Sequence, residues 1–179
     1  MSHSALRPQA PDASTYRTVL GHFATGVVLV TAIDGGEPVG MACNSFTSLS
    51  LEPPLVLFCA AKSSSTWPRI QAAGKWAANF LDEDGEELCR LFAQKGADRF
   101  ARISYAPGRT GAPILEDALA FVDCETIAEH DAGDHLIVVG RVVESGDHFV
   151  VVGGVTDLDV QHEGGPLVFF RGGYGRFES

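Results

Sequence analysis

The sequence predicts a mainly β protein with flanking helices, built as an antiparallel barrel. Apolar runs rich in β-branched residues, such as Val27 to Ile33, recur along the chain and are typical of buried strands. Polar turn segments such as DGGEP at 34–38 join consecutive runs and favour hairpins. Strands and helices do not alternate regularly, and no glycine-rich dinucleotide fingerprint follows the first strand, which argues against a doubly wound sheet. An antiparallel barrel would also leave no exposed sheet edges.

The first half of the chain is expected to begin with a disordered tail over residues 1–12, followed by a folded domain over 13–179. Ser14 is a plausible N-cap for a helix that carries apolar residues at helical spacing and stops at Gly26. Thr66, Pro68 and Gly74 have the positions of a cap, a first-turn proline and a stop for a second short helix. A third helix is expected over 85–94. Strands are expected at Val27 to Ile33, Val39 to Asn44, Leu55 to Ala61 and Lys75 to Leu81.

The second half of the chain contains another clear hairpin. Ala118 to Glu129 and His135 to Glu144 are strand-like, and HDAGD at 130–134 is the predicted turn between them. The segment 96–113 is expected to be irregular. Further strands are expected at Phe149 to Val152 and Leu167 to Arg171.

The composition restricts the class of protein. The chain has 179 residues, is 45% hydrophobic and carries a formal net charge of -10, which suits one domain that avoids nucleic acid and anionic membranes. Its four cysteines, at 43, 59, 89 and 124, lack CxxC spacing. All except Cys43 lie in apolar runs or on the apolar face of a predicted helix, so reduced core thiols in a cytoplasmic protein are expected. No apolar run reaches the roughly 20 residues that span a bilayer, and the N-terminus lacks the apolar core of a signal peptide.

The stretch ACNSFTSLS at 42–50 places small polar residues between two apolar runs. In an extended chain Asn44 and Ser48 would face one way and Ser45 and Thr47 the other, so both faces would be polar. Hydroxyls, an amide and free backbone N–H groups suit a planar heterocycle or a phosphate. The alternative is a loop in which these side chains bond their own backbone.

The segment KSSST at 62–66 precedes the second predicted helix. Lys62 supplies a positive charge, the hydroxyls supply donors, and a helix N-terminus favours an anion. The alternative is ordinary capping by Thr66, which would use one of the hydroxyls. If the two hydroxyl-rich segments converge, they form a site for a phosphorylated ligand.

Other chemistry has weaker support. Asp134 and His135 lie at the predicted hairpin turn, where His135 could pair with Asp134 or point into a cleft. A metal site formed with His130 and Asp131 lacks the usual ligand spacing, so no metal is expected. Tyr174 lies beside glycines and could cover a flat ligand or form part of the core edge. A GxSxG motif is absent, which disfavours a nucleophilic hydrolase.

Taken together, these residues resemble the flavin reductase family, the small FMN-binding split-barrel proteins that supply reduced flavin to two-component monooxygenases. The resemblance runs from about Tyr16 to Tyr174. It is carried, in this order, by FATGVVLVTA (23–32), ACNSFTSLSLEPPLV (42–56), KSSST, the NF of AANFL (79–80), AGDH (132–135) and PLVFFRGGY (166–174).

The resemblance implies an antiparallel split β-barrel that forms a homodimer and binds flavin near the subunit interface. It implies that the flavin ring and ribityl chain are wrapped by Ala42, Cys43, Asn44, Ser45, Phe46, Thr47, Ser48 and Ser50. It further implies that Ala61, Lys62, Ser63 and Ser64 hold the flavin phosphate. Gly133, Asp134, His135 and Tyr174 are the implied NAD(P)H residues.

The implied activity is NAD(P)H:flavin oxidoreduction, in which a hydride passes from NADH or NADPH to FMN or FAD. Reduced flavin would then reach a partner monooxygenase by diffusion. The alternatives are a reductase of another acceptor such as a ferric chelate, which keeps its FMN, and a non-enzymatic flavin-binding protein. The segment 147–165 is longer than the resemblance leads one to expect, and an extra strand or hairpin near the cleft mouth is the interpretation of this length.

Overall fold

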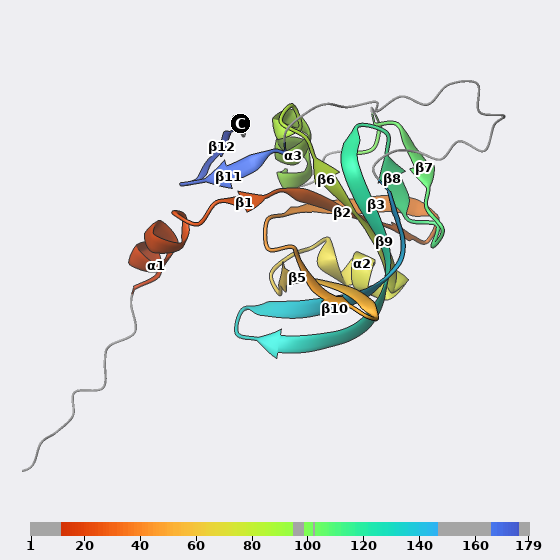
Figure 1. The fold of residues 1–179 in the computed structure, drawn as a ribbon, viewed down its shortest axis with the longest axis horizontal. Coiled ribbons are helices and arrows are strands. Elements are labelled where there is room, and N and C mark those ends of the chain that lie inside the picture. The colour runs from red at the N-terminus through yellow and green to blue at the C-terminus, as the bar shows by residue number, and fades with distance from the viewer. Residues whose placement is uncertain (1–11, 95–98, 102, 147–165, 176–179) are drawn as a thin grey trace, which may run out of the picture.

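The computed structural model describes residues 12–94, 99–101, 103–146 and 166–175. Within them, seven strands form one sheet in the order β3-β2-β6-β9-β10-β5-β4, and every pair of neighbours is antiparallel (Figure 1). These strands are β2 (Val28–Asp34), β3 (Glu37–Cys43), β4 (Thr47–Leu51), β5 (Pro54–Ala61), β6 (Lys75–Leu81), β9 (Ala118–Ala132) and β10 (His135–Gly146). The predicted class, a mainly β antiparallel fold with flanking helices, is therefore confirmed.

The two outer strands of this sheet, β3 and β4, are consecutive in the chain. Residues 44–46 carry the chain from one to the other, and β3 approaches β5, the neighbour of β4. In the described part of the chain no ladder of hydrogen bonds joins β3 directly to β4. The sheet therefore curves toward closure and leaves a seam at the stretch 44–46.

Two smaller sheets complete the β structure. One contains β1 (Thr25–Gly26), β11 (Val168–Phe170) and β12 (Gly173–Gly175), and the other pairs β7 (Tyr105–Pro107) with β8 (Pro113–Leu115). The expectation that 96–113 is irregular is thus wrong for β7 and for the start of β8. These strands have three residues each, and long-range bonds hold β8: Leu115 N–H donates to Asn79 Oδ1 at 2.8 Å. Local sequence patterns contain no sign of such a bond.

Three helices are described: α1 (Ala13–Leu20), α2 (Trp67–Ala73) and α3 (Glu86–Ala93). The third lies within the predicted 85–94. Asp12, and not Ser14, caps α1, because its Oδ1 accepts the N–H groups of both Ser14 and Thr15 at 3.0 Å. The helix also ends at Leu20, well before Gly26.

The N-terminus of α2 is capped by a different side chain from the one predicted. Thr66 has the N-cap position but makes no capping bond with its side chain. Instead, the Ser64 hydroxyl accepts the N–H groups of Thr66 and Trp67 at 3.2 and 3.1 Å. Gly74 ends the helix in the left-handed conformation, as its position predicted.

The hairpin of β9 and β10 is tighter than predicted. Strand β9 continues to Ala132, so His130 and Asp131 belong to the strand and the turn is Gly133 and Asp134. Gly133 has φ of +68°, which glycine adopts without strain. Strand β11 confirms the strand expected at 167–171, whereas the one expected at 149–152 and the role of 147–165 lie outside the described residues.

Aromatic side chains fill the main core. Phe58 meets Trp67 and Trp76 edge to face, with ring centroids 5.6 and 5.0 Å apart. A second cluster packs Cys89 and Phe92 of α3 on the other face of β2, where Leu29 points away from Val28 and Val30. The core therefore fixes α3 beside the β11–β12 hairpin, where Figure 1 also places it.

None of the described helices is long and apolar enough to cross a membrane.

Candidate functional site

A cavity of about 200 Å³ opens where β3 leaves the sheet. It lies between that strand end, α3 and the β11–β12 hairpin. Its lining residues are Val27, Ala42, Cys43, Asn44, Cys89, Phe169 and Tyr174. Four of these, Ala42, Cys43, Asn44 and Tyr174, are residues that the sequence placed in a binding site. The structure thus brings the first part of the predicted flavin segment and the predicted closing tyrosine to one pocket.

The strand register explains why this pocket contains the start of the ACNSFTSLS stretch. Ala42 and Cys43 still pair with Leu29 and Val28 of β2, and the chain departs from the sheet at Asn44. Asn44 is therefore exposed, with its amide free to face a ligand. Cys43 is buried, and this burial raises the pKa of its thiol, so the residue contributes a neutral wall.

Tyr174 forms the other side of the pocket. Its hydroxyl lies 3.0 Å from Cys89 Sγ, and its ring lies 5.3 Å from the ring of Phe169. The guanidinium of Arg90 lies 5.2 Å above the same ring. Burial, helped by the hydrogen bond with Cys89, raises the pKa of Tyr174 to about 12, so the phenol stays neutral.

Ser45 and Phe46 have structural contacts that the sequence did not reveal. The Ser45 hydroxyl accepts the N–H of Cys59 at 2.9 Å and donates to the carbonyl of Cys59 at 3.2 Å. Phe46 packs on the main core, with its ring 5.4 Å from that of Phe80. Neither residue lines the pocket, so the structure does not bring them together with Ala42 to Asn44 there.

Thr47, Ser48 and Ser50 lie on β4, the outer strand beside β5. Thr47 and Ser48 are exposed, and the register shifts between Ser48 and Ser50. The Thr47 hydroxyl lies 3.3 Å from the Ser48 carbonyl, a local contact of the kind the alternative interpretation described. The ACNSFTSLS stretch is therefore divided between a pocket wall, a bridge to β5 and an exposed strand.

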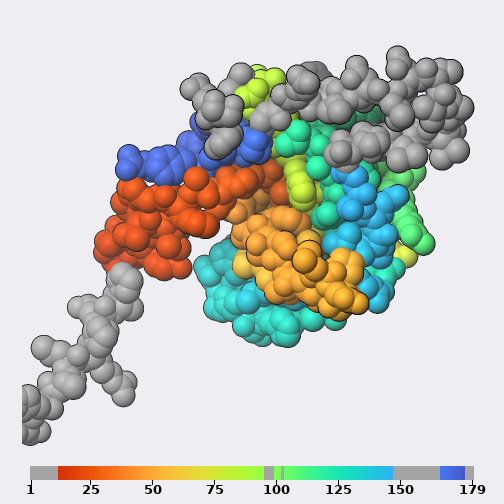
Figure 2. All heavy atoms as spheres, in the orientation of Figure 1, coloured from red at the N-terminus to blue at the C-terminus, as the bar shows by residue number. Residues whose placement is uncertain are grey.

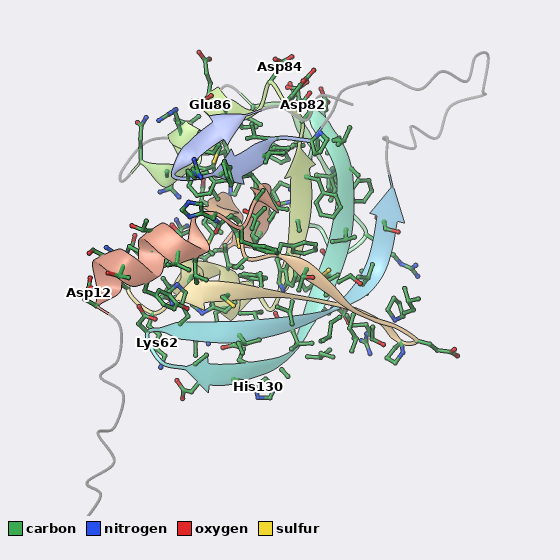
Figure 3. All side chains as sticks on the ribbon, turned by 60° about the vertical axis from the view of Figure 1, so that its left-hand side comes forward. Asp12, Lys62, Asp82, Asp84, Glu86 and His130 are labelled. Carbon is green, nitrogen blue, oxygen red and sulfur yellow. The ribbon has the colours of Figure 1, made fainter. Side chains whose placement is uncertain are left out.

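The predicted phosphate segment and the predicted NAD(P)H turn are direct neighbours. Strand β5 ends at Ala61 opposite His135, and the Lys62 N–H donates to the Asp134 carbonyl at 2.9 Å. The side chains of Ser63 and Lys62 are exposed here. Two segments far apart in sequence thus form one end of the hairpin, and Figure 3 shows Lys62 beside it and His130 on its outer side.

Charges at this end of the hairpin are paired. Lys62 Nζ forms an ion pair with Asp131, which lowers the pKa of that carboxyl. His135 Nδ1 lies 2.8 Å from Asp134 Oδ1, and the contact lowers the pKa of Asp134. Lys62 and His135 remain close to half exposed, at 42% and 43% of their side-chain surface, so a ligand can reach both.

The pocket and the hairpin end are joined through one bridge. Asn44 lines the pocket, Ser45 next to it binds the backbone of Cys59, and Cys59 lies two residues before Ala61. In the described ranges no group of three or more His, Cys, Asp or Glu side chains is placed to hold a metal ion. The site therefore offers an apolar pocket at one end, and the ammonium group of Lys62 and the imidazole of His135 at the other.

Three pocket residues were missed by reasoning from the sequence: Val27, Cys89 and Phe169. Cys89 was assigned to the core because it lies on the apolar face of a predicted helix. That face is buried, but its thiol also reaches Tyr174, which lies 85 residues further along the chain. Only the resemblance of the closing segment could have directed attention to this region.

Comparison with known proteins identifies the family. Residues 20–145 match the family model described as the flavin reductase like domain. The chain belongs to the flavin reductase family. This membership confirms the resemblance read from the sequence and the predicted enzyme class, an NAD(P)H-dependent flavin reductase.

Individual relatives in the flavin reductase family cover nearly the whole chain. A flavin reductase from Pseudomonas putida is 43% identical over 94% of this chain and 92% of its own. The reductase subunit HsaB of a flavin-dependent monooxygenase from Rhodococcus jostii is 42% identical over 95% of this chain and 80% of its own. Among solved structures, nitrilotriacetate monooxygenase component B from Mycobacterium thermoresistibile is 40% identical, with a TM-score of 0.81 over 92% of this chain and 86% of that one.

Proposed function

We propose that this flavin reductase binds its two substrates between the pocket at Tyr174 and the hairpin end at Lys62, and passes reduced flavin to a partner monooxygenase. The observation that carries the proposal is that Ala42, Cys43, Asn44 and Tyr174 line the same pocket. The bound nucleotides supply the redox chemistry, a hydride that passes from NAD(P)H to FMN or FAD. The protein therefore has to bind, orient and exclude water.

The pocket fits an aromatic heterocycle. Apolar or neutral side chains form its walls, and Asn44 adds one amide that can pair with a polar ring edge. The neutral thiols of Cys43 and Cys89 and the neutral phenol of Tyr174 add no charge that would repel a reduced ring. The role of these residues is to hold two rings in contact and keep water out.

The hairpin end suits the phosphate groups. Lys62 supplies a positive charge there and His135 an imidazole ring that can form hydrogen bonds, and both have exposed surface despite their carboxylate partners. A phosphate can take over these pairs, since it accepts several charge-assisted hydrogen bonds at once. Lys62 with Ser63 faces the flavin phosphate, and Gly133 to His135 orient the nicotinamide nucleotide. Ser64 supports this segment indirectly, because its hydroxyl is used to cap α2.

The direct test of this function is a steady-state assay that crosses NADH and NADPH with FMN, FAD and riboflavin, after the absorption spectrum of the purified protein has been recorded. Oxidation of the nucleotide only when flavin is present supports the proposal. A protein that binds flavin but shows no turnover with any pair overturns it. The same assay identifies the preferred flavin and nucleotide.

His135→Ala tests whether the turn at 133–135 binds the nicotinamide nucleotide and not the flavin. The Michaelis constant for the nucleotide should rise more than that for flavin, and the reverse pattern rejects the role given to His135. His130→Ala is the matched control, because His130 is exposed on the neighbouring strand and points away from the turn (Figure 3). It should leave both constants unchanged.

The proposal includes a homodimer of split barrels. Helix α1 has no buried residue, and it stands with the β11–β12 hairpin as a flank of the molecule (Figure 2). Four apolar side chains of this region, Tyr16, Val19, Leu20 and Phe23, are between 52% and 77% exposed. An exposed amphipathic helix of this kind is typical of an interface. Sedimentation velocity should give a dimer for the wild type, and Val19→Asp should shift it to monomer; a wild-type monomer contradicts the proposal.

A further inference from the structure

The ring of Tyr174 is held from three directions by side chains of two different elements. Phe169 of β11 contacts one side, with ring centroids 5.3 Å apart. From α3, Arg90 covers the ring at 5.2 Å, and Cys89 Sγ meets the hydroxyl at 3.0 Å. The tyrosine that closes the pocket is thus attached to α3 as well as to its own hairpin.

The hairpin has little other support near Tyr174. Strands β11 and β12 have three residues each, and a ribbon of that size is not stable by itself. Backbone bonds tie strand β11 and the turn to the body: the Leu167 N–H donates to the Leu81 carbonyl at 3.0 Å, β1 pairs with β11, and the Arg171 N–H donates to the Gly21 carbonyl at 2.7 Å. Strand β12, which carries Tyr174, pairs only with β11 among the described strands. Beyond its ladder with β11 and the contact with Phe169, the position of Tyr174 depends on the side chains of α3.

Helix α3 is a firm support for these contacts. Cys89 and Phe92 are each 2% exposed and pack on the second core cluster. Arg90 is oriented along the helix by its ion pair with Glu86, at 2.7 Å. The thiol of Cys89 is fixed by this packing, so it presents one defined hydrogen-bonding position to the tyrosine.

We propose that Cys89 is a positioning residue of the reaction, which holds Tyr174 against the pocket and thereby sets the affinity for the nicotinamide nucleotide. This inference rests on the proposed function. In this role the thiol acts through the hydroxyl of Tyr174 and needs no contact with the reacting atoms. When the contact between Cys89 and Tyr174 is removed, β12 moves Tyr174 away from the pocket for part of the time. The nucleotide then loses its contact with the tyrosine ring. The Michaelis constant for the nucleotide then rises, while turnover of the bound complex stays nearly the same.

The experiment compares Cys89→Ala, Cys89→Ser, Tyr174→Phe and the double variant Cys89→Ala with Tyr174→Phe. Loss of one neutral hydrogen bond corresponds to about a two- to tenfold change. We expect Cys89→Ala to raise the Michaelis constant for the nucleotide by that factor and to change kcat less than twofold. Cys89→Ser keeps a donor and acceptor at the position and should restore the constant. Cys124→Ala is the matched control, since Cys124 is a buried thiol outside the pocket.

The double variant distinguishes positioning from general damage to the core. Tyr174→Phe removes the same hydrogen bond from the other partner, so Cys89→Ala should add almost nothing to it. Full additivity of the two changes overturns the proposal. Equal effects of Cys89→Ala and Cys124→Ala also overturn it. Tyr174→Phe leaves the helix intact, so the comparison with wild type stands even where Cys89→Ala fails to fold.

A second readout is independent of turnover. Amide hydrogen exchange over residues 168–175 should be faster in Cys89→Ala than in wild type and should return to the wild-type rate in Cys89→Ser. Unchanged exchange in Cys89→Ala contradicts the positioning role. If the wild type itself oxidises no nucleotide with flavin, the proposed function fails, but the exchange measurement still tests the contact between α3 and the hairpin.

Discussion

The hydroxyl of Ser45 binds both backbone groups of Cys59. It accepts the Cys59 N–H at 2.9 Å and donates to the Cys59 carbonyl at 3.2 Å. One serine therefore connects the chain between the two outer strands, β3 and β4, to the middle of β5. A residue that looks like a ligand contact in the sequence has a structural role at the seam of the sheet.

Ser45→Ala should lower the free energy of unfolding by about 1–2 kcal/mol, because it leaves two backbone groups of Cys59 without their partner. Urea unfolding followed by tryptophan fluorescence measures this change. Ser48→Ala is the control, since Ser48 is exposed on β4 and should change stability by less than about 0.5 kcal/mol. Equal effects of the two substitutions would contradict the bridge.

Much of the large sheet could be predicted from the sequence because its strands are long and apolar and their turns have clear composition. Examples of this kind are β6, Lys75–Leu81, and β10, which begins at His135. Short strands such as Pro113–Leu115 could not be predicted, because a bond from a distant part of the chain holds them: the Leu115 N–H donates to Asn79 Oδ1. The cap of α1 was misplaced for a different reason. Asp12 and Ser14 are both good cap residues, and only the geometry decides that the carboxylate reaches both N–H groups.

The candidate site, too, could be predicted from the sequence only in part. The composition of the 42–50 stretch signalled polar groups in an unusual place, and Asn44 does line the pocket. The pattern could not separate the roles of neighbours, since Ser45 turns to β5 and Phe46 to the core. Cys89 was read as core alone, because its contact with Tyr174 exists only after the chain has folded.

Asp123 leads to a prediction about the pH dependence of stability. The side chain is fully buried, and it accepts the N–H and hydroxyl of Thr110 at 2.7 and 2.5 Å. Burial is the main cause that raises the pKa of this carboxyl above its ordinary 3.8, and nearby Glu144 adds to it. The folded state therefore binds this proton more tightly than the unfolded state.

The sign of the effect follows from that difference. Below about pH 3.8 Asp123 is protonated in both the folded and the unfolded state, so its burial as a charged group costs no free energy of unfolding. As the pH rises through the raised pKa, the contribution of Asp123 to the free energy of unfolding falls and then levels off. Asp123→Asn lacks this dependence. The stability of wild type minus that of the variant should therefore decrease from pH 4 upward, as measured by urea unfolding; an increase with pH would contradict the raised pKa.

Gly140 faces the largest buried side chain of the core. A Cβ at this position would overlap Cζ2 of Trp76 and lie 3.0 Å from its Cη2. Trp76 is fully buried and packed against Phe58, so it has no room to move. Gly140→Ala should therefore cost about 1–3 kcal/mol of unfolding free energy. Gly26→Ala, where nothing lies within 4 Å of the added carbon, should cost less than about 1 kcal/mol. Thermal unfolding of both variants measures the difference, and equal midpoints would refute the overlap.

Lys62 allows the phosphate end of the proposed site to be tested with two ligands that differ in one group. FMN carries a phosphate and riboflavin does not, so the comparison isolates the contribution of the charge. Lys62→Gln should weaken FMN about two- to fivefold, the range expected for a solvent-exposed pair, and should leave riboflavin unchanged. Lys75→Gln is the control, because Lys75 is exposed at the start of β6, away from the hairpin end.

The ion pair between Lys62 and Asp131 allows a second substitution, which should have the opposite effect on FMN binding. In the free protein Asp131 competes with a phosphate for Lys62. Asp131→Asn removes that competition, so FMN should bind more tightly while riboflavin again stays unchanged. Both effects should shrink in high salt, since the side chains of Lys62 and Asp131 are 42% and 82% exposed and their charges are screened. Fluorescence quenching titrations at low and high salt measure the dissociation constants of FMN and riboflavin for wild type and for each variant. If Lys62→Gln weakens FMN and riboflavin equally, the lysine supports the loop and does not contact the phosphate, and the assignment of the hairpin end fails.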